Sequence, residues 1–250
     1  MNELNDLLRR AEDLQNRCER NGVLTATNFL TPAERLQLTR WVKTQPGCRL
    51  VFSGGHPDCE RMVGFFLPDY LEEEWLPLDE QIRAFELTAA FGSPGHRDYL
   101  GALLGMGIER DRLGDIWVRD NTAVVFCLPG IEKHLLSIDK VGRCTVRSRT
   151  LSLEEISPPE RKVKKKSFSV QSLRLDAVTG GLFDLSRTEA ARQVEAGNVS
   201  LNYEICDRPD MSVRPDDILS LRGKGKGRIT GLGGSSRKGR QFVEGEIYLS

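Results

Sequence analysis

The chain has 250 residues, of which 39% are hydrophobic and 29% are charged. This length suits two or three small domains better than one large domain, and the apolar content is enough to give each of them a core. The longest apolar run, Val124–Leu128, is far too short to cross a bilayer, so we expect no membrane-spanning segment and no membrane partner.

The cysteines and the N-terminal segment predict a cytoplasmic protein. Acidic residues occur within the first thirteen positions, which contain no continuous apolar block, and this argues against a signal or transit peptide. The six cysteines include no Cys-x-x-Cys pair and no histidine at ligand spacing, so we expect reduced, mostly buried thiols and no zinc or other metal site. The cysteines are Cys18, Cys48, Cys59, Cys127, Cys144 and Cys206.

The formal net charge is zero, but the charges are unevenly distributed along the chain. Residues 161–250 hold 17 Lys and Arg against 11 Asp and Glu, a balance of +6, whereas residues 1–160 hold 19 against 25, a balance of −6. Affinity for phosphate depends on local clusters of Lys and Arg and not on the isoelectric point of the whole chain. This uneven distribution of charge predicts that the C-terminal part binds a polyanion.

Residues 1–77 are expected to form a small α+β domain. Leucines recur every three or four positions near the N-terminus, as on one face of an amphipathic helix, and the first forty residues look helical. Thr31, Pro32 and Glu34 form a helix-start pattern, with a capping threonine, proline in the first turn and glutamate three positions after the cap. The expected elements are helices over 4–14 and 31–43 and strands over 49–52 and 62–67.

Residues 80–152 are expected to form a ferredoxin-like domain with the element order β-α-β-β-α-β. Many RNA-recognition domains have this topology, but so do metabolic enzymes and structural domains. The strands lack the interleaved aromatic residues with which an RNA-recognition motif stacks bases, so the fold alone does not indicate a function. The elements are expected at 82–87, 96–105, 115–118, 121–127, 131–138 and 143–149.

Residues 153–170 are expected to connect this domain to a C-terminal domain at 171–250. Two adjacent prolines and a run of lysines suit a solvated, extended connector. Two interpretations remain open, because the lysines either only solvate the connector or form an arm that contacts phosphates. The lysines concerned are Lys164, Lys165 and Lys166.

The segment from Leu173 is expected to open a helix that Gly180-Gly181 break, and a second helix should begin at Ser186. Ser186 and Glu189 have the spacing of a capping box, which leaves backbone N–H groups and the positive end of the helix dipole facing outward. Arg187 lies in this first turn, where a cation opposes the dipole, so contact with a phosphate explains it better than helix stability does. Arg192 should lie on the same broad solvent side.

The following segment, 197–228, predicts two short strands and a basic glycine-rich loop. Val199–Tyr203 alternates as a strand and tight turn, and Ile218–Leu221 is a second strand. The sequence Arg-Gly-Lys-Gly-Lys-Gly-Arg at 222–228 then interleaves cations with glycines, which allow a backbone to approach a phosphate closely. Such a loop alone is usually a flexible solvated turn, but after a helix and strand it is more specific.

Four motifs in this order resemble the S4 RNA-binding domain: Arg-Leu-Asp at 174–176, Ser-Arg-Thr-Glu-Ala-Ala-Arg-Gln-Val at 186–194, Gly-Asn-Val-Ser-Leu-Asn at 197–202, and Val-Arg-Pro-Asp-Asp-Ile-Leu-Ser-Leu-Arg-Gly-Lys-Gly at 213–225. The resemblance covers about 75 residues and implies two short helices and a small sheet that hold structured RNA. It places Asn202 in a turn beside the RNA surface. The RNA-binding residues that it implies are Arg174, Ser186, Arg187, Thr188, Arg192, Gln193, Asn202, Arg222, Lys224, Lys226 and Arg228.

The first two domains carry further motifs: Ser-Gly-Gly-His at 53–56, Glu-Arg at 60–61, His-Arg-Asp-Tyr-Leu-Gly-Ala-Leu-Leu-Gly-Met-Gly-Ile-Glu-Arg at 96–110, and Gly-Asp-Ile at 114–116. Over nearly the full chain these motifs resemble the YlmH family of bacterial three-domain proteins. The resemblance implies binding to the large ribosomal subunit, contacts with rRNA and tRNA, and a role in ribosome-associated quality control. His96, Arg97 and the connector lysines are second candidate contacts.

One alternative is a pseudouridine synthase, an enzyme class that often carries S4 domains. Residues 174–182 resemble the catalytic Arg-Leu-Asp stretch of those enzymes, which would make Asp176 the nucleophile. Against this, Asp176 falls inside the S4 match, about 70 residues remain after it for a catalytic domain, and no second copy of the motif lies upstream. We therefore expect no enzyme, no cofactor and no small-molecule substrate.

Other catalytic patterns are weaker. His96 and Asp98 do not share a helix face at this spacing, so a helix-capping or interface role is favoured over acid–base catalysis. Gly231–Gly234 lacks the Gly-Lys-Ser/Thr of a phosphate-binding loop.

A different class of function is an adaptor, in which the acidic residues 1–150 contact a protein or a second RNA surface. A cyanobacterial and plastid branch of the family that the chain resembles is linked to photosystem biogenesis, and cell division is a further context. The sequence thus predicts an α+β protein of three small domains that is a monomer when free.

Overall fold

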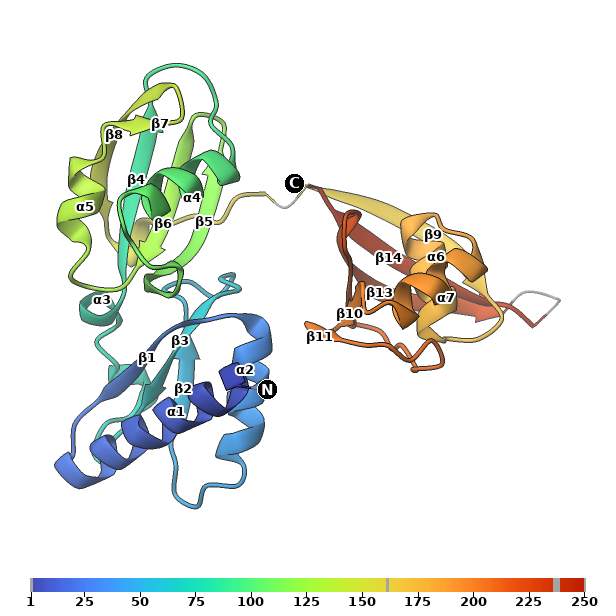
Figure 1. Ribbon diagram of the computed structural model, residues 1–250, viewed down its shortest axis with the longest axis horizontal. Coiled ribbons are helices and arrows are strands. Elements are labelled where there is room, and N and C mark those ends of the chain that lie inside the picture. The colour runs from blue at the N-terminus through green and yellow to red at the C-terminus, as the bar shows by residue number, and fades with distance from the viewer. Residues whose placement is uncertain (1, 161, 236–238, 250) are drawn as a thin grey trace. The chain divides into compact units, whose positions relative to one another are not determined.

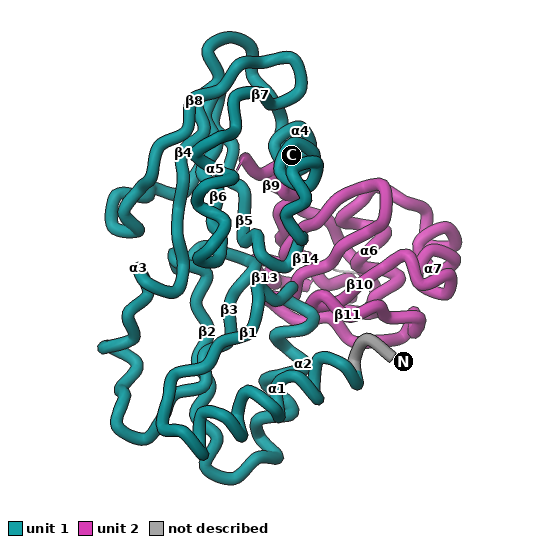
Figure 2. The backbone as a smooth tube through the Cα atoms, turned by 60° about the vertical axis from the view of Figure 1, so that its left-hand side comes forward, with its two compact units in different colours: residues 1–159 teal, residues 160–250 magenta. Residues whose placement is uncertain are grey.

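The computed structural model describes residues 2–160, 162–235 and 239–249 (Figure 1). The chain forms two compact units, residues 1–159 and residues 160–250 (Figure 2). The first unit contains two sheets and the second contains one, and helices accompany each sheet. The protein is therefore a mixed α+β chain with three small sheet-based parts.

The N-terminal part of the first unit is an antiparallel sheet of order β1-β3-β2, which packs against α1 and α2. Leu30 and Phe66 face these helices and share a core cluster with Leu38 of α2, whereas Phe29 and Phe65 belong to the other face. The elements are α1 (Asn2–Asn21), β1 (Thr25–Leu30), α2 (Pro32–Val42), β2 (Leu50–Ser53), β3 (Met62–Phe66) and α3 (Leu78–Gln81).

Both strands and both helices expected here are confirmed, but the helical interpretation of the first forty residues misses β1. Residues 25–30 place Phe29 and Leu30 on opposite faces of the sheet, where both are buried, and a helix would not separate them in this way. The start of α2 is as expected, because the Thr31 hydroxyl accepts from Glu34 N and the Glu34 carboxylate accepts from Thr31 N at 2.7 Å.

The middle part is an antiparallel sheet of order β5-β6-β4-β8-β7, and α4 and α5 cover one of its faces (Figure 1). Phe85 and Leu87 of β4 point to this face, where they pack with Tyr99 and Leu103 of α4 and Leu135 of α5. The expected β-α-β-β-α-β order is confirmed. The elements are β4 (Arg83–Ala89), α4 (His96–Gly105), β5 (Leu113–Arg119), β6 (Thr122–Cys127), α5 (Glu132–Ser137), β7 (Lys140–Val141) and β8 (Cys144–Leu151).

The two parts of the first unit share one junction. The Asp115 carboxylate on β5 accepts the backbone N–H groups of Glu60 at 2.8 Å and Arg61 at 3.0 Å. The Arg61 guanidinium donates in turn to the carbonyls of Leu113 and Phe29. Buried apolar residues of both sheets meet in one core cluster around this junction, so residues 1–159 form a single compact unit.

The second unit is a six-stranded antiparallel sheet of order β11-β10-β12-β13-β14-β9, with α6 and α7 packed on one face (Figure 1). Its core contains Leu182 of α6, Val194 of α7 and Leu219 of β12. The elements are β9 (Val163–Val170), α6 (Leu175–Phe183), α7 (Arg187–Glu195), β10 (Val199–Leu201), β11 (Glu204–Ile205), β12 (Ile218–Leu221), β13 (Gly225–Ser235) and β14 (Gln241–Tyr248).

Two expectations for this unit require correction. Residues 163–170, expected within the extended connector, form the edge strand β9, because they pair with β14 along their whole length and Phe168 and Val170 pack into the core. Arg161 of that connector lies outside the described residues. Gly180-Gly181 do not break α6; a Cβ on Gly181 would lie 2.1 Å from the Phe168 ring, so glycine allows β9 to pack closely against the helix.

Candidate nucleic-acid interface

The start of α7 carries the first group of expected site residues. Ser186 is the N-cap, and its hydroxyl accepts from Glu189 N at 3.2 Å. The Glu189 side chain does not complete the expected capping box, because its carboxylate accepts from Gln193 and pairs with Arg192 at 2.6 Å. Arg192 remains 73% exposed, so this surface pair leaves it accessible to a ligand.

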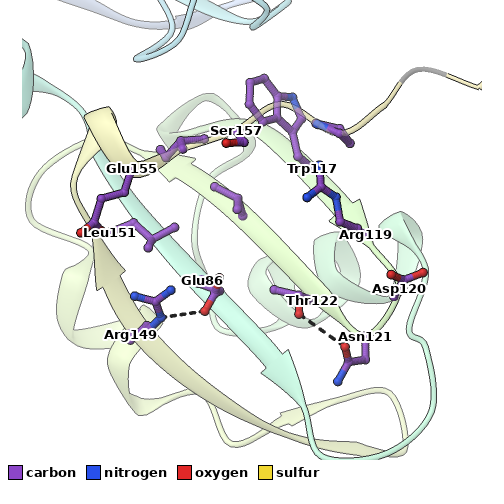
Figure 3. Close-up of a pocket in the computed structure, with 13 residues that line it drawn as sticks. Glu86, Trp117, Arg119, Asp120, Asn121, Thr122, Arg149, Leu151, Glu155 and Ser157 are labelled. Atoms are coloured by element: carbon purple, nitrogen blue, oxygen red, sulfur yellow. Dashed lines mark hydrogen bonds and ion pairs between the residues drawn. The ribbon is translucent and has the colours of Figure 1, made fainter.

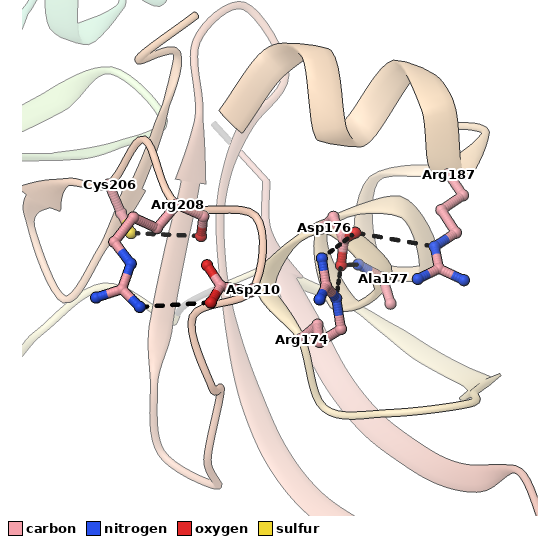
Figure 4. A network of polar contacts seen from close by, with 7 residues as sticks. All are labelled: Arg174, Asp176, Ala177, Arg187, Cys206, Arg208 and Asp210. Atoms are coloured by element: carbon pink, nitrogen blue, oxygen red, sulfur yellow. Dashed lines mark hydrogen bonds and ion pairs between the residues drawn. The ribbon is translucent and has the colours of Figure 1, made fainter. Parts of the chain in front are cut away.

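A buried carboxylate joins two of the expected arginines (Figure 4). Asp176 lies in the first turn of α6 with its side chain only 5% exposed. Arg174, the N-cap residue of α6, donates to it through Nε and Nη2, both at 3.1 Å. Arg187 from the start of α7 brings its Nε to 3.8 Å from the same carboxylate and is 65% exposed. Two separate helix starts therefore present their guanidinium groups together.

A third arginine, Arg208, lies in the loop that packs against the start of α6, and sequence reasoning missed it. Leu175 N donates to Met211 O at 2.8 Å and Asp176 N donates to Pro209 O at 3.1 Å, which fixes this loop beside the helix. Arg208 pairs with Asp210 at 3.4 Å in the same network (Figure 4). The only sequence signal was an Arg-Pro-Asp turn without a helical or strand pattern.

The other end of α6 carries a lysine cluster. Asp184 ends the helix in the left-handed conformation, with a φ of 56°, and its carboxylate accepts a hydrogen bond from Lys166 of β9. This hydrogen bond and the charges of Lys166, Lys164 and Lys224 lower the pKa of Asp184. The structure thus brings Lys164 and Lys166 of the expected connector together with Lys224 of the expected glycine-rich loop. Lys165 alternates to the opposite face of β9.

The basic segment 222–228 is not one loop. Only Arg222, Gly223 and Lys224 form the turn between β12 and β13, and β13 begins at Gly225. Gly227 is buried beneath Leu182 of α6, so its neighbours Lys226 and Arg228 extend from the opposite, helix-free face of the sheet. The expectation of a single surface made of α7 and all four cations is therefore wrong.

The cations on the helix-free face have partners within the domain. Lys226 Nζ lies 5.6 Å from the ring centroid of Tyr203 and 5.8 Å from that of Tyr248, which places it between two tyrosines. The Arg228 guanidinium donates a hydrogen bond to Asp216. Both cations are engaged before any ligand arrives.

Three polar residues of the expected site have different surroundings. Thr188 is exposed in the first turn of α7. Gln193 donates to Glu189 at 2.7 Å and accepts from Asn198 at 2.9 Å. Asn202 has a φ of 50° in the β10–β11 turn, where its side chain binds Asp217 and the N–H of Ile218. The turn position of Asn202 agrees with expectation, although its amide already has partners.

The second candidate contacts His96 and Arg97 are exposed at the start of α4 in the other unit. Desolvation and the nearby Arg110 lower the pKa of His96, so the imidazole is neutral at physiological pH. The Asp98 carboxylate accepts from Gly95 N at 2.8 Å and caps α4. Asp98 therefore has the capping role favoured over a catalytic dyad.

The helix-free face of the middle sheet contains a hollow of about 460 Å³ (Figure 3). Trp117 lies at one side of it and meets His56 and Phe126 edge to face. Arg149 pairs with Glu86 across the sheet at 2.7 Å. Acidic side chains outnumber basic ones around this hollow, which makes it a poorer phosphate site than the surface of α6 and α7. The charged residues that line it are Glu86, Arg119, Asp120, Arg149 and Glu155.

Among the described residues, no group of His, Cys, Asp and Glu could hold a metal ion, and no helix is long and apolar enough to cross a membrane. The six cysteines are free thiols, of which three are buried. Burial raises the pKa of Cys48 to about 11 and that of Cys127 to about 12, so both stay protonated at neutral pH.

Comparison with known proteins agrees with this architecture. Residues 79–155 match the family model described as a putative RNA-binding domain in YlmH, and residues 182–219 match the S4 domain. A solved structure of the cell division protein ylmH from Streptococcus pneumoniae is 23% identical with a TM-score of 0.52, over 62% of this chain and 95% of that one, which supports the fold.

A curated relative establishes the family. The ribosome-associated protein quality control protein P2 of Bacillus subtilis is 32% identical over 221 residues, which cover 87% of this chain and 84% of the relative. The family models match one range in each unit, residues 79–155 in the first and 182–219 in the second. The chain therefore belongs to the YlmH family of S4-domain proteins.

Proposed function

We propose that this protein is a non-catalytic RNA-binding factor of ribosome-associated quality control. Its S4 domain binds structured RNA, namely rRNA and tRNA on the large ribosomal subunit, in the cytoplasm, and the free protein is a monomer. The observation that carries the proposal is the exposed cationic surface of α6 and α7, with Arg187 and Arg192 at 65% and 73% exposure. The family membership supports the ribosomal context.

The RNA-contacting surface consists of the α7 start, the Asp176 network and the lysine cluster at Asp184. The exposed arginines supply charge-assisted contacts to phosphate, and the α7 start supplies outward N–H groups. Lys226 and Arg228 contribute less, because they already have partners on the other face. The remaining expected residues at the edge of this surface are Thr188, Arg222 and Lys224.

The direct test is Arg187→Glu with Arg192→Glu, measured by co-sedimentation with ribosomal subunits across a salt series. We expect affinity to fall about tenfold or more and the slope of log affinity against log salt to flatten by about two, since two phosphate contacts are lost. Arg9→Glu with Arg17→Glu on α1 is the matched control, because both arginines are exposed helical cations in the other unit. Equal binding by the double variant and wild type would refute the site.

The synthase alternative has its own readout. Asp176 is 5% exposed and pairs with two arginines, so its carboxylate is not free to attack a base. We expect Asp176→Asn to leave the pseudouridine content of cellular RNA unchanged. A loss of pseudouridine at defined positions would instead assign the chain to that enzyme class.

A second candidate function is an RNA-anchored adaptor whose first unit contacts a protein. Tyr70 and Trp75 are 69% and 72% exposed beside the acidic run Glu72–Glu74, which is unusual for such large side chains. Replacing both with serine should leave affinity for isolated rRNA fragments unchanged but lower occupancy on whole subunits. If occupancy on whole subunits is unchanged, the adaptor function is refuted and RNA binding by the second unit remains the proposed function.

A further inference from the structure

The Asp176 network contains a carboxylate where RNA binding alone would favour none. A negative charge next to a phosphate site opposes binding, and a buried charge is costly unless it is paired. Asp176 is nevertheless almost fully buried, and its two oxygens face the guanidinium groups of Arg174 and Arg187. The carboxylate must therefore contribute more than its repulsion of a nearby phosphate costs.

The arrangement indicates what that role is. Arginine side chains are long and lose rotamer freedom when they bind, unless something holds them in place beforehand. Asp176 holds Arg174 through two hydrogen bonds of 3.1 Å, and this pairing raises the pKa of Arg174. The Arg174 side chain is still 39% exposed and that of Arg187 is 65% exposed, so both guanidinium groups can donate further N–H groups to a ligand.

The surroundings fix the carboxylate itself. Asp176 Oδ1 accepts from Ala177 N at 2.7 Å, and Asp176 N donates to Pro209 O, so the residue is held by the helix and by the adjacent loop. The same loop carries Arg208, with Asp210 as its own partner at 3.4 Å. The position of the carboxylate is therefore fixed, and the two long arginine side chains bind to it.

We propose that Asp176 is a positioning residue, which holds Arg174 and Arg187 as a two-armed clamp for one RNA phosphate, with Arg208 at its edge. The proposal rests on RNA binding by the S4 domain. Arg174 is the N-cap residue of α6 and Arg187 is the first residue of α7, so the clamp joins side chains from the starts of two helices. The two possible roles of Asp176 predict opposite changes in RNA affinity when the carboxylate is neutralised: affinity rises if only its charge matters and falls if it positions the arginines.

The test measures binding of a ribosomal RNA fragment by Asp176→Asn. Asparagine keeps the size of the side chain and an oxygen for Ala177 N, but holds the arginines less tightly. Positioning predicts affinity about tenfold weaker, equivalent to loss of one well-placed charged contact. If Asp176 acts only through its charge, its removal strengthens binding, and that result overturns the proposal. Asp210→Asn is the matched control, in which an exposed acid is removed and affinity should hold or rise.

A double-mutant cycle separates positioning from a general loss of structure. In a background with Arg174→Ala and Arg187→Ala, Asp176→Asn should have no further effect on affinity, because the side chains that it holds are gone. An equal loss in both backgrounds means that Asp176 supports the fold only, and the proposal fails.

A second set of variants does not touch the carboxylate. Arg174→Lys with Arg187→Lys keeps both charges but removes the planar forks that Asp176 holds, so affinity should fall about tenfold. Arg192→Lys, an exposed arginine outside the clamp, should change affinity less than about twofold. Full affinity in the double lysine variant would refute the clamp. If Arg187→Glu with Arg192→Glu also binds normally, the RNA site itself is wrong and not only the role of Asp176.

Discussion

The S4 domain has two basic segments, the start of α7 and residues 222–228, and they differ in what surrounds their cations. Around α7, Arg187 and Arg192 also contact acids, Asp176 and Glu189, but keep 65% and 73% of their side chains exposed. On β13, Lys226 lies between two tyrosines and Arg228 is bound to Asp216 on the other face of the sheet. The number of cations in a motif therefore does not determine its affinity for phosphate; their partners and the direction in which the strand points them do.

The largest expected effect concerns the support of the helical face. In Gly181→Ala the new Cβ would lie 2.1 Å from the Phe168 ring, so α6 and β9 would have to move apart. Overpacking of this kind costs about 1–3 kcal/mol, which exceeds the gain of about 1 kcal/mol expected for alanine in a helix interior. Urea unfolding should show the second unit destabilised and RNA affinity reduced. Gly101→Ala in α4, where nothing lies within 4 Å of a new Cβ, should instead stabilise the first unit.

The next effect contrasts the two basic segments directly. Lys224→Glu reverses a charge in the exposed turn beside Asp184 and should weaken RNA binding about tenfold. Arg228→Ala removes a cation that is already paired, so affinity should change less than about threefold and stability by at most about 1 kcal/mol. Filter binding at fixed salt compares them. Similar losses for both variants would remove the distinction between the two faces.

The smallest effect concerns the acid at the end of α6. Asp184→Asn releases Lys164, Lys166 and Lys224 from a competing carboxylate, so RNA affinity should rise about two- to threefold. Because the pKa of Asp184 is lowered in the folded state, its stabilising contribution is present above its unfolded pKa and is lost as pH falls through the lower folded value. The stability difference between wild type and variant should therefore be constant above about pH 5 and shrink below about pH 4. A decrease in affinity would show that Asp184, like Asp176, positions its lysines.

The sequence predicts the middle domain well, because its strands alternate clearly and its turns are marked by Pro, Gly and Asn. It misses β1, whose six residues lie between two helix signals, and most of the β13–β14 hairpin, because Gly225–Ser235 has too few apolar residues for a clear period. The interruption expected at Gly180-Gly181 fails for a tertiary reason, since α6 is maintained by the close approach of β9.

For the candidate site, the sequence could identify the cationic residues, but it could not predict on which face each one lies or which partners it contacts. Cationic residues in the S4 motifs identify Arg174, Arg187 and Arg192 as candidates. The side of the sheet on which Lys226 and Arg228 lie depends on the register of β13, and a one-residue shift would exchange the faces. Arg208 and the buried contacts of Asp176 depend on a loop that is distant in sequence, and no local pattern encodes such a contact.

The junction around Arg61 and Asp115 has a thermodynamic consequence. Because Phe29 of the first sheet and Phe126 of the second share one core, separation of the two sheets would expose both, and neither sheet can melt without the other losing its packing. Residues 1–159 should therefore unfold as one cooperative block. Calorimetry should resolve two transitions for this chain of three sheets, and Gly114→Ala, whose Cβ would lie 2.7 Å from the Phe29 ring, should lower the melting temperature of the first unit alone.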